Sequence, residues 1–222
     1  MRAVAWDIDG TLIDSEPLHD AALSEVCALY GADISDLPHN VFRGVHMPDV
    51  WRMLRSRLPA GLTEAEWSEA IIARYVDRAP ELRPMPGAVG AMRKFAAAGL
   101  PQVCVSNSGR RVVDANLRAL GIQNVIAFSM SLEDVSSGKP DPEPYATAAR
   151  RLGLAPGEVA AVEDSLAGAA SAVAAGLRVF ALSSGDHAPP GTILVRRLDD
   201  LPDMILPRSA ARPAAGRMPH GL

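Results

Sequence analysis

The chain has 222 residues, of which 48% are hydrophobic and 22% are charged, and its net charge is −4. This composition excludes a disordered chain and a coiled coil. A length between one and two average domains fits a main core with an inserted smaller module. The negative charge argues against nucleic acid or an anionic membrane as the main partner.

Cysteine content and hydropathy indicate where the protein works. Cys27 and Cys104 are too few for a disulfide framework, and each lies in an apolar stretch. No run approaches the ~20 apolar residues needed to span a bilayer, and no charged apolar leader precedes the first apolar run. We therefore expect a cytoplasmic protein with no membrane or nucleic-acid partner, a monomer by default with a dimer left open.

The first predicted elements are a strand followed by helices. The apolar run Ala3–Trp6 predicts a buried strand that ends in a polar turn containing glycine. Apolar residues at helical spacing then predict one helix from Pro17 to about Tyr30 and a second along Met47–Leu58. A third helix is expected to begin at the capping-box pair Thr63 and Glu66.

After Pro84 the pattern changes to alternating strands and helices. Strands are predicted at 102–105, near 125–128, at 159–162 and at 179–182. Repeated strand–helix units are typical of a parallel sheet covered on both faces. The predicted fold class is therefore α/β, a Rossmann-like parallel sheet with helices on both faces and an inserted all-helical cap domain.

The domain organisation follows from these elements. The expected α/β core is discontinuous and comprises 1–14 and 86–206, while the helical cap comprises 15–85, where no strand is predicted. The segment 207–222 is rich in proline, alanine and arginine and is expected to be a flexible tail.

Polar side chains follow four of the predicted elements at their carboxyl ends. They are Asp7 and Asp9, Ser106 and Asn107, Lys139 in its turn, and Glu163 and Asp164. Ligand sites in parallel α/β sheets lie outside the carboxyl ends of the strands. All four groups are therefore expected to converge on one edge of the sheet.

These residues resemble the four signature motifs of the haloacid dehalogenase superfamily, in its phosphatase and phosphomutase branch. The motifs in this chain are Asp7-Ile8-Asp9-Gly10-Thr11-Leu12, Val105-Ser106-Asn107, Gly138-Lys139-Pro140 and Val162-Glu163-Asp164-Ser165. Their order and spacing agree with the family, and the helical insert after the first motif is similar to its small cap.

The resemblance implies roles for two aspartates and a metal. Asp7 would be the nucleophile that forms an aspartyl-phosphate, and Asp9 would be the acid and base for the leaving group and water. Mg²⁺ would be held by Asp7, the backbone carbonyl of Asp9, and Asp164, with Glu163 as a ligand or supporting acid. The dehalogenase branch lacks an acid at the position of Asp9, which favours phosphoryl transfer on a small phosphate ester.

The resemblance also implies a phosphate cradle. Lys139, one of only two lysines among 22 basic residues, would offset charge on Asp7 and on the phosphoryl oxygens. Ser106, Asn107 and Thr11 would bind those oxygens. Taken alone, the Asp-Gly pair could make a turn, Ser106 could cap a helix and Lys139 could be an exposed turn residue.

The cap motifs leave the activity open between two enzymes. His19 stands at the histidine position of the β-phosphoglucomutase-like branch, and Arg43 matches a basic residue of the cap loop, so both are candidate substrate contacts. Met47 stands where the mutase pattern has arginine, which favours a phosphatase over a hexose-phosphate mutase.

Other classes of protein fit less well. A non-catalytic phosphometabolite-binding regulator stays an alternative, although every expected catalytic position is filled. A receiver domain would carry its aspartate after a later strand and would have no cap. A dinucleotide-binding enzyme would have a glycine fingerprint after the first strand, and none is present there.

Overall fold

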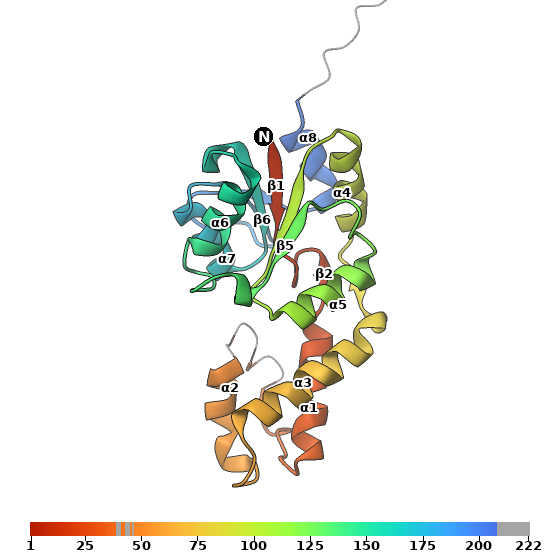
Figure 1. The fold of residues 1–222 in the computed structure, drawn as a ribbon, viewed down its shortest axis with the longest axis vertical. Helices are drawn as coiled ribbons and strands as arrows, with labels where there is room; N and C mark the ends of the chain where they lie inside the picture. Colours follow the sequence, from red (N-terminus) through yellow and green to blue (C-terminus); the bar gives the residue numbers. More distant parts are fainter. Residues whose placement is uncertain (39–40, 43–44, 46, 208–222) are drawn as a thin grey trace, which may run out of the picture.

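The core of the molecule is a six-stranded parallel sheet (Figure 1). The computed structural model describes residues 1–38, 41–42, 45 and 47–207. The spatial order of the strands is β5–β4–β1–β6–β7–β8. Their bounds are Ala3–Trp6 (β1), Gln102–Val105 (β4), Phe128–Met130 (β5), Val159–Glu163 (β6), Arg178–Leu182 (β7) and Thr192–Val195 (β8). This arrangement confirms the predicted α/β fold class.

Helices cover both faces of the sheet because successive residues of each strand point to opposite sides. On one face, Val4 and Trp6 pack in a cluster with α4 (Ala88–Ala97), α5 (Arg110–Leu120) and α8 (Leu201–Ile205). On the other, Ala3 and Ala5 pack with α6 (Glu143–Leu152) and α7 (Leu166–Ala174). Both faces are apolar, so the strands lack the polar alternation of a half-exposed sheet.

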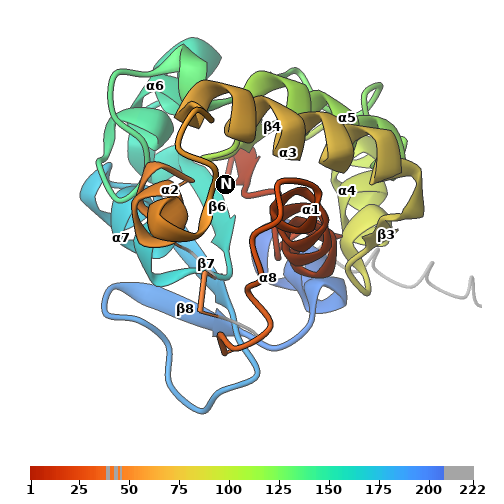
Figure 2. The same ribbon diagram turned by 90° about the horizontal axis from the view of Figure 1, so that it is seen from below.

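The helical insert follows β1 in the chain and lies beyond one end of the sheet (Figures 1 and 2). It contains α1 (Glu16–Leu29), α2 (Met47–Leu54) and α3 (Glu64–Arg78), with short 3₁₀ turns after α2 and α3. The capping box is confirmed: the Thr63 Oγ1 accepts from the Glu66 N–H, and the Glu66 carboxylate accepts from the Thr63 N–H. No described helix is long and apolar enough to cross a membrane.

Two short strands join the insert to the core. β2 (Ile13–Asp14) pairs antiparallel with β3 (Arg83–Pro84), so the outgoing and returning chains run side by side. The prediction of no strand within 15–85 is therefore wrong at β3, because a two-residue pairing leaves no periodicity in the sequence. The domain division at 15–85 stays a prediction, with this pairing beside both of its boundaries.

The sequence also misplaces β5 and misses β8. The strand expected near 125–128 begins only at Phe128, because the Val125 N–H bonds to the Ile122 carbonyl and closes a turn before it. β8 is an edge strand beside β7. Its short apolar run follows a loop of proline and glycine and resembles loop sequence until the pairing with β7 is seen.

Candidate active site

The predicted site residues meet at the carboxyl ends of three adjacent strands. Asp7 follows β1, Ser106 follows β4, and Glu163 is the last residue of β6, with β1 between the other two. Lys139 reaches the same edge from the turn before α6. The three strands are parallel and adjacent, so their ends bring together residues that lie far apart in the sequence.

Lys139 is the buried centre of this cluster. Its Nζ donates to Asp7 Oδ1 at 2.7 Å, to Glu163 Oε1 at 2.5 Å and to the Val105 carbonyl at 2.8 Å. The Lys139 side chain is 4% exposed and that of Glu163 is fully buried. The Tyr145 hydroxyl adds a second donor to Glu163 Oε1 at 2.5 Å. An ammonium ion can satisfy three acceptors in this way without the planar geometry of a guanidinium.

Burial and neighbouring charges shift the pKa values of the cluster. Burial, and then the charge of Glu163, raise the pKa of Asp7 well above its ordinary value, and Lys139 only partly opposes them. Burial acts against the charged form of Lys139, but the carboxylates of Asp7 and Glu163 outweigh it and raise its pKa. Burial and Glu163 raise the pKa of Asp164 to about 6. Asp7 and Asp164 therefore lack a positive neighbour sufficient to offset their burial.

The donor set fits a hard divalent cation. Asp7, Glu163 and Asp164 each offer a carboxylate oxygen, and these atoms lie within 4.8 Å of one another. Asp7 Oδ2 is buried and has no hydrogen-bond partner among the described residues. A buried acceptor without a partner is costly, and an all-oxygen donor set is what Mg²⁺ prefers. The cluster therefore suits a cation that would satisfy Asp7 Oδ2.

The three carboxylates differ in how free they are to bind a metal. Glu163 Oε1 accepts from Lys139 and Tyr145, and its Oε2 accepts from the Ser165 hydroxyl at 3.2 Å. Asp164 Oδ1 accepts from the Thr11 hydroxyl at 3.1 Å. Because both oxygens of Glu163 already have donors, Asp7 and Asp164 are the better ligands and Glu163 is the better partner for Lys139.

Two glycines make room for these carboxylates. Gly10 has φ +81°, and a Cβ there would overlap the Asp164 carboxylate. A Cβ on Gly168, in the first turns of α7, would overlap the Glu163 carboxyl group. Gly168 therefore allows the backbone of α7 to lie close to the Glu163 side chain.

We expect Gly168→Ala to lower the free energy of unfolding by about 1–3 kcal/mol, the usual cost of overpacking. The Ala methyl would displace Glu163 and with it the Lys139 ammonium, so enzymatic activity should fall as well. Gly90→Ala in α4 is the matched control, since the nearest atom to its Cβ would be 4.0 Å away. That variant should gain about 0.5–1 kcal/mol from helix propensity. Urea denaturation of both variants measures the difference, and equal stability would contradict it.

Asp9 has donors on both carboxylate oxygens. Its Oδ1 accepts from Asn116 Nδ2 at 2.9 Å and lies 3.6 Å from His19 Nε2. Its Oδ2 accepts from the hydroxyls of Ser106 at 3.1 Å and Ser108 at 2.9 Å. Burial by itself would raise the pKa of Asp9, but His19, Ser15 and Ser108 together outweigh it and hold the pKa below its ordinary value. The pKa of Asp9 is thus lowered, whereas the pKa of Asp7, two residues away, is raised.

Asn107 contacts the turn that carries Lys139. Its Nδ2 donates to the Lys139 carbonyl at 3.0 Å, and its Oδ1 accepts from the Lys139 N–H at 2.7 Å. The Asn107 amide nitrogen carries two hydrogens and this bond uses one of them, so the phosphate-binding role expected for Asn107 stays a prediction. In the present geometry Asn107 positions Lys139, while the Ser106 hydroxyl donates to Asp9.

The cap contributes His19 to the site. His19 lies in α1, and its ring stacks on Tyr75 of α3 with centroids 4.3 Å apart. Arg43, the other predicted cap contact, lies outside the described residues. His46 does too.

Three residues of the network were not singled out as site residues from the sequence. In the sequence, Tyr75 and Tyr145 stand at apolar positions of helical stripes. In the structure, both hydroxyls contact site residues or their partners. Asn116 is fully buried and lies three residues after Val113 on the apolar face of α5. A polar residue at such a position is the signal that could have identified it.

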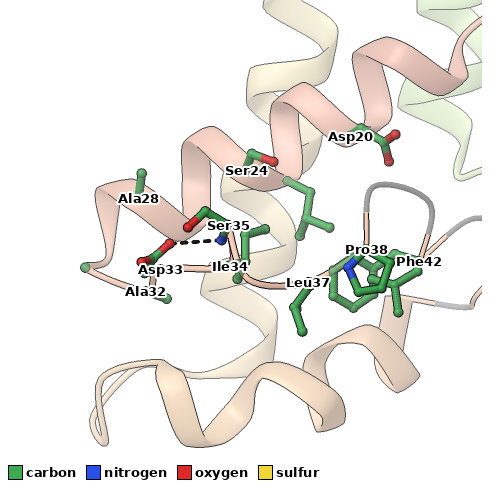
Figure 3. Close-up of a pocket in the computed structure, with 13 residues that line it drawn as sticks. Asp20, Ser24, Ala28, Ala32, Asp33, Ile34, Ser35, Leu37, Pro38 and Phe42 are labelled. Atoms are coloured by element: carbon green, nitrogen blue, oxygen red, sulfur yellow. Dashed lines mark hydrogen bonds between the residues drawn. The ribbon is translucent and has the colours of Figure 1, made fainter.

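The structure also has cavities, both away from this cluster and beside it. A cavity of about 620 Å³ lies inside the cap between α1 and the segment that follows it (Figure 3). None of the predicted site residues that the structure describes lines it. A second cavity, of about 400 Å³, begins at Asp164 and Ser165 and extends along the loop after β7. The second cavity adjoins the site, whereas the first does not.

Sequence and structural comparisons identify the family to which this fold and site belong. The family model for haloacid dehalogenase-like hydrolases matches residues 1–176. The chain therefore belongs to the haloacid dehalogenase-like hydrolases, and the resemblance of its four motifs is confirmed. It is an enzyme of the phosphomonoester hydrolase type in that family.

Two of the relatives are named as phosphatases. The chain is 32% identical to hexitol phosphatase A of Escherichia coli over 191 residues, 85% of this chain and 86% of the relative. It is 29% identical to the phosphorylated carbohydrates phosphatase of Thermotoga maritima over 186 residues, 80% of this chain and 82% of the relative. The crystal structure of CbbY from Rhodobacter sphaeroides, in complex with phosphate, superposes with a TM-score of 0.79 at 26% identity. That match covers 90% of this chain and 96% of CbbY.

Proposed function

We propose that this enzyme is a Mg²⁺-dependent phosphatase that hydrolyses a small phosphorylated sugar or polyol through an aspartyl-phosphate on Asp7. One observation carries the proposal: one Asp7 oxygen accepts from Lys139, and the other is buried without a hydrogen-bond partner in the described part of the chain. Burial of a carboxylate without sufficient compensation is unfavourable, so a group that supplies positive charge on that side, such as a divalent cation, would complete the site.

The first step is attack by Asp7 on phosphorus. The Asp7 carboxylate forms a bond to the phosphoryl group as the bond to the leaving alcohol breaks, which divides one hard displacement into two easier ones. Lys139 stays protonated because its pKa is raised, and its ammonium offsets negative charge as the phosphoryl group approaches. Glu163 and Tyr145 keep that ammonium in place.

The second role belongs to Asp9. It donates a proton to the departing alcohol oxygen and then takes one from the water that hydrolyses the aspartyl-phosphate. Hydrogen bonds from Ser106, Ser108 and Asn116 favour the ionised form in the present arrangement. Binding of the substrate must exchange at least one of these bonds for the alcohol oxygen before Asp9 can act as the acid.

The residues that would hold the cation are Asp7 and Asp164, with the Asp9 backbone carbonyl completing the protein ligands. When bound, the cation would neutralise repulsion between the anionic nucleophile and the anionic phosphate. Thr11 orients Asp164 through its hydroxyl. The cap helices lie over the same edge of the sheet (Figure 1), where they would exclude bulk water and contact the rest of the substrate.

The substrate class rests on the relatives. Hexitol phosphatase A and the phosphorylated carbohydrates phosphatase are named for polyol and sugar phosphates. We expect this chain to release inorganic phosphate most rapidly from such esters, with glycolate and nucleotide phosphates slower. A phosphate-release assay over these four classes, with Mg²⁺ and with EDTA in excess, tests substrate and metal together.

Three results would contradict the proposal. Release that is unaffected by EDTA would exclude the metal, and no release from any ester would exclude the hydrolase. Conversion of a hexose phosphate to its isomer, dependent on a bisphosphate and without net phosphate release, would instead identify a mutase.

A further inference from the structure

Asp9 is held from one side by a buried pair that links the core to the cap. Asn116, in the middle of α5, donates from Nδ2 to Asp9 Oδ1 at 2.9 Å. Tyr75, near the end of α3, donates its hydroxyl to Asn116 Oδ1 at 2.8 Å. Asn116 is fully buried and Tyr75 is 1% exposed. The chain of contacts therefore runs from a cap helix through a core helix to the proposed acid and base.

The hydrogen-bond chemistry determines which way the Asn116 amide points. An ionised carboxylate can only accept hydrogen bonds, so the NH₂ group of Asn116 must face Asp9. The carbonyl of the same amide then faces Tyr75, whose hydroxyl must donate to it. Loss of the Tyr75 hydroxyl would leave a buried carbonyl without a partner and would remove the bond that keeps the amide from rotating.

Tyr75 also contacts the other neighbour of Asp9 Oδ1. Its ring stacks on the His19 imidazole at 4.3 Å between centroids, and His19 Nε2 lies 3.6 Å from that oxygen. One cap side chain thus contacts both residues that lie against Asp9 Oδ1, Asn116 by a hydrogen bond and His19 by stacking.

We propose that Asn116 and Tyr75 are positioning residues that orient the Asp9 carboxyl group for proton transfer to the leaving group. The inference rests on the proposed function, in which Asp9 is the acid for the departing alcohol. Small displacements of a reacting group cost large factors in rate, so a pair that orients Asp9 contributes to the reaction without touching the substrate.

The leaving group of the substrate separates this role from a structural one. An alkyl phosphate releases a strongly basic alkoxide and needs the proton from Asp9, whereas 2,4-dinitrophenyl phosphate releases a stable phenolate and does not. The quantity to compare is kcat/KM, because it includes no step after the first product leaves. A general loss of structure lowers both values, while misplacement of Asp9 lowers only the first.

The test measures kcat/KM of the wild-type enzyme and of variants for a hexitol 6-phosphate and for 2,4-dinitrophenyl phosphate. Asp9→Asn sets the maximal selective loss. We expect Asn116→Leu to lower the value for the hexitol phosphate by at least about tenfold, as general acid catalysis contributes about 10²–10⁴-fold. Its kcat/KM for the dinitrophenyl ester should change by less than about threefold, because this leaving group needs no proton from Asp9. Tyr75→Phe removes only one hydroxyl. It should show the same selective loss of kcat/KM for the hexitol phosphate, but a smaller one than Asn116→Leu.

Leu120→Ala is the matched control, because Leu120 is buried in the same helix and lies outside the network. It should lower the midpoint of thermal unfolding and leave the ratio of the two kcat/KM values unchanged. Should Asn116→Leu fail to fold, Tyr75→Phe decides the question alone.

The outcomes separate the inference from the function on which it rests. Equal losses on both substrates in Asn116→Leu or Tyr75→Phe, or a shift of the ratio in Leu120→Ala, would overturn the positioning role while the phosphatase stands. A wild-type enzyme that hydrolyses neither ester would overturn both.

Discussion

Replacement of Asp7 by asparagine is expected to lower kcat/KM for a sugar phosphate by at least about a thousandfold, because the amide cannot form the phosphoryl-enzyme. The protein should stay folded. Burial and Glu163 raise the pKa of Asp7, so its ionised form is disfavoured in the folded protein. This destabilisation is absent below the pKa that Asp7 has in the unfolded chain and is fully present above its pKa in the folded protein. A neutral asparagine amide avoids it at every pH.

Three measurements check this prediction. Phosphate release reports the loss of activity, and thermal unfolding at pH 7 should give Asp7→Asn a midpoint no lower than that of the wild type. Wild-type protein incubated with substrate should carry a phosphoryl group that acid quenching and mass spectrometry locate on the peptide containing Asp7. Activity within about tenfold of the wild type, well short of the loss of a nucleophile, would refute the assignment.

Replacement of Lys139 by methionine is expected to lower the free energy of unfolding more than any other substitution considered above. The change removes the cation between two buried carboxylates, Asp7 and Glu163, and a stranded buried charge costs about 3–5 kcal/mol. Activity should fall by at least about a hundredfold, since the charge that offsets the phosphoryl oxygens is lost with it.

The loss of stability should depend on pH in a defined direction. Without Lys139, the pKa of Asp7 in the folded protein rises further above its unfolded value. The penalty is then present at pH 8 and decreases as the pH falls and Asp7 binds a proton. Urea denaturation at pH 8 and pH 5 should therefore give a larger deficit at pH 8.

The chain offers a matched control in its other lysine. Lys94 lies exposed in α4, and Lys94→Met should change the free energy of unfolding by no more than about 0.5 kcal/mol. A Lys139→Met protein as stable as Lys94→Met, or a deficit that is larger at pH 5, would contradict the buried charge network.

The residues that could be predicted from the sequence share one property. Asp7, Asp9, Ser106, Asn107, Glu163 and Asp164 all lie at or directly after a strand, and Lys139 lies in a turn beside them. Parallel strands place their carboxyl ends on one edge, so position along the chain is enough to predict that these side chains converge. The motif order then distinguishes the family, which the match over residues 1–176 confirms.

The residues that could not be predicted act through helices from elsewhere in the chain. Tyr145, Asn116 and Tyr75 lie within helical stripes, where an aromatic ring or a single polar residue resembles ordinary core. Their roles depend on specific hydrogen bonds between side chains, such as the one that the Tyr145 hydroxyl donates to Glu163. The edge strand β8 was missed for a similar reason, because only its pairing with β7 distinguishes it from a loop.

The sequence by itself determined the α/β class, the position of the helical insert, and the set of carboxylates and one lysine at the edge of the sheet. These depend on periodicity and on local order, which the chain carries along its length. Only the tertiary structure decided how those groups divide their contacts. Glu163 is bound to Lys139 and Tyr145, Asn107 to the Lys139 turn, and Asp9 to Asn116. Such contacts join residues separated by 18 to 107 positions, and each depends on the packing of whole helices against the sheet.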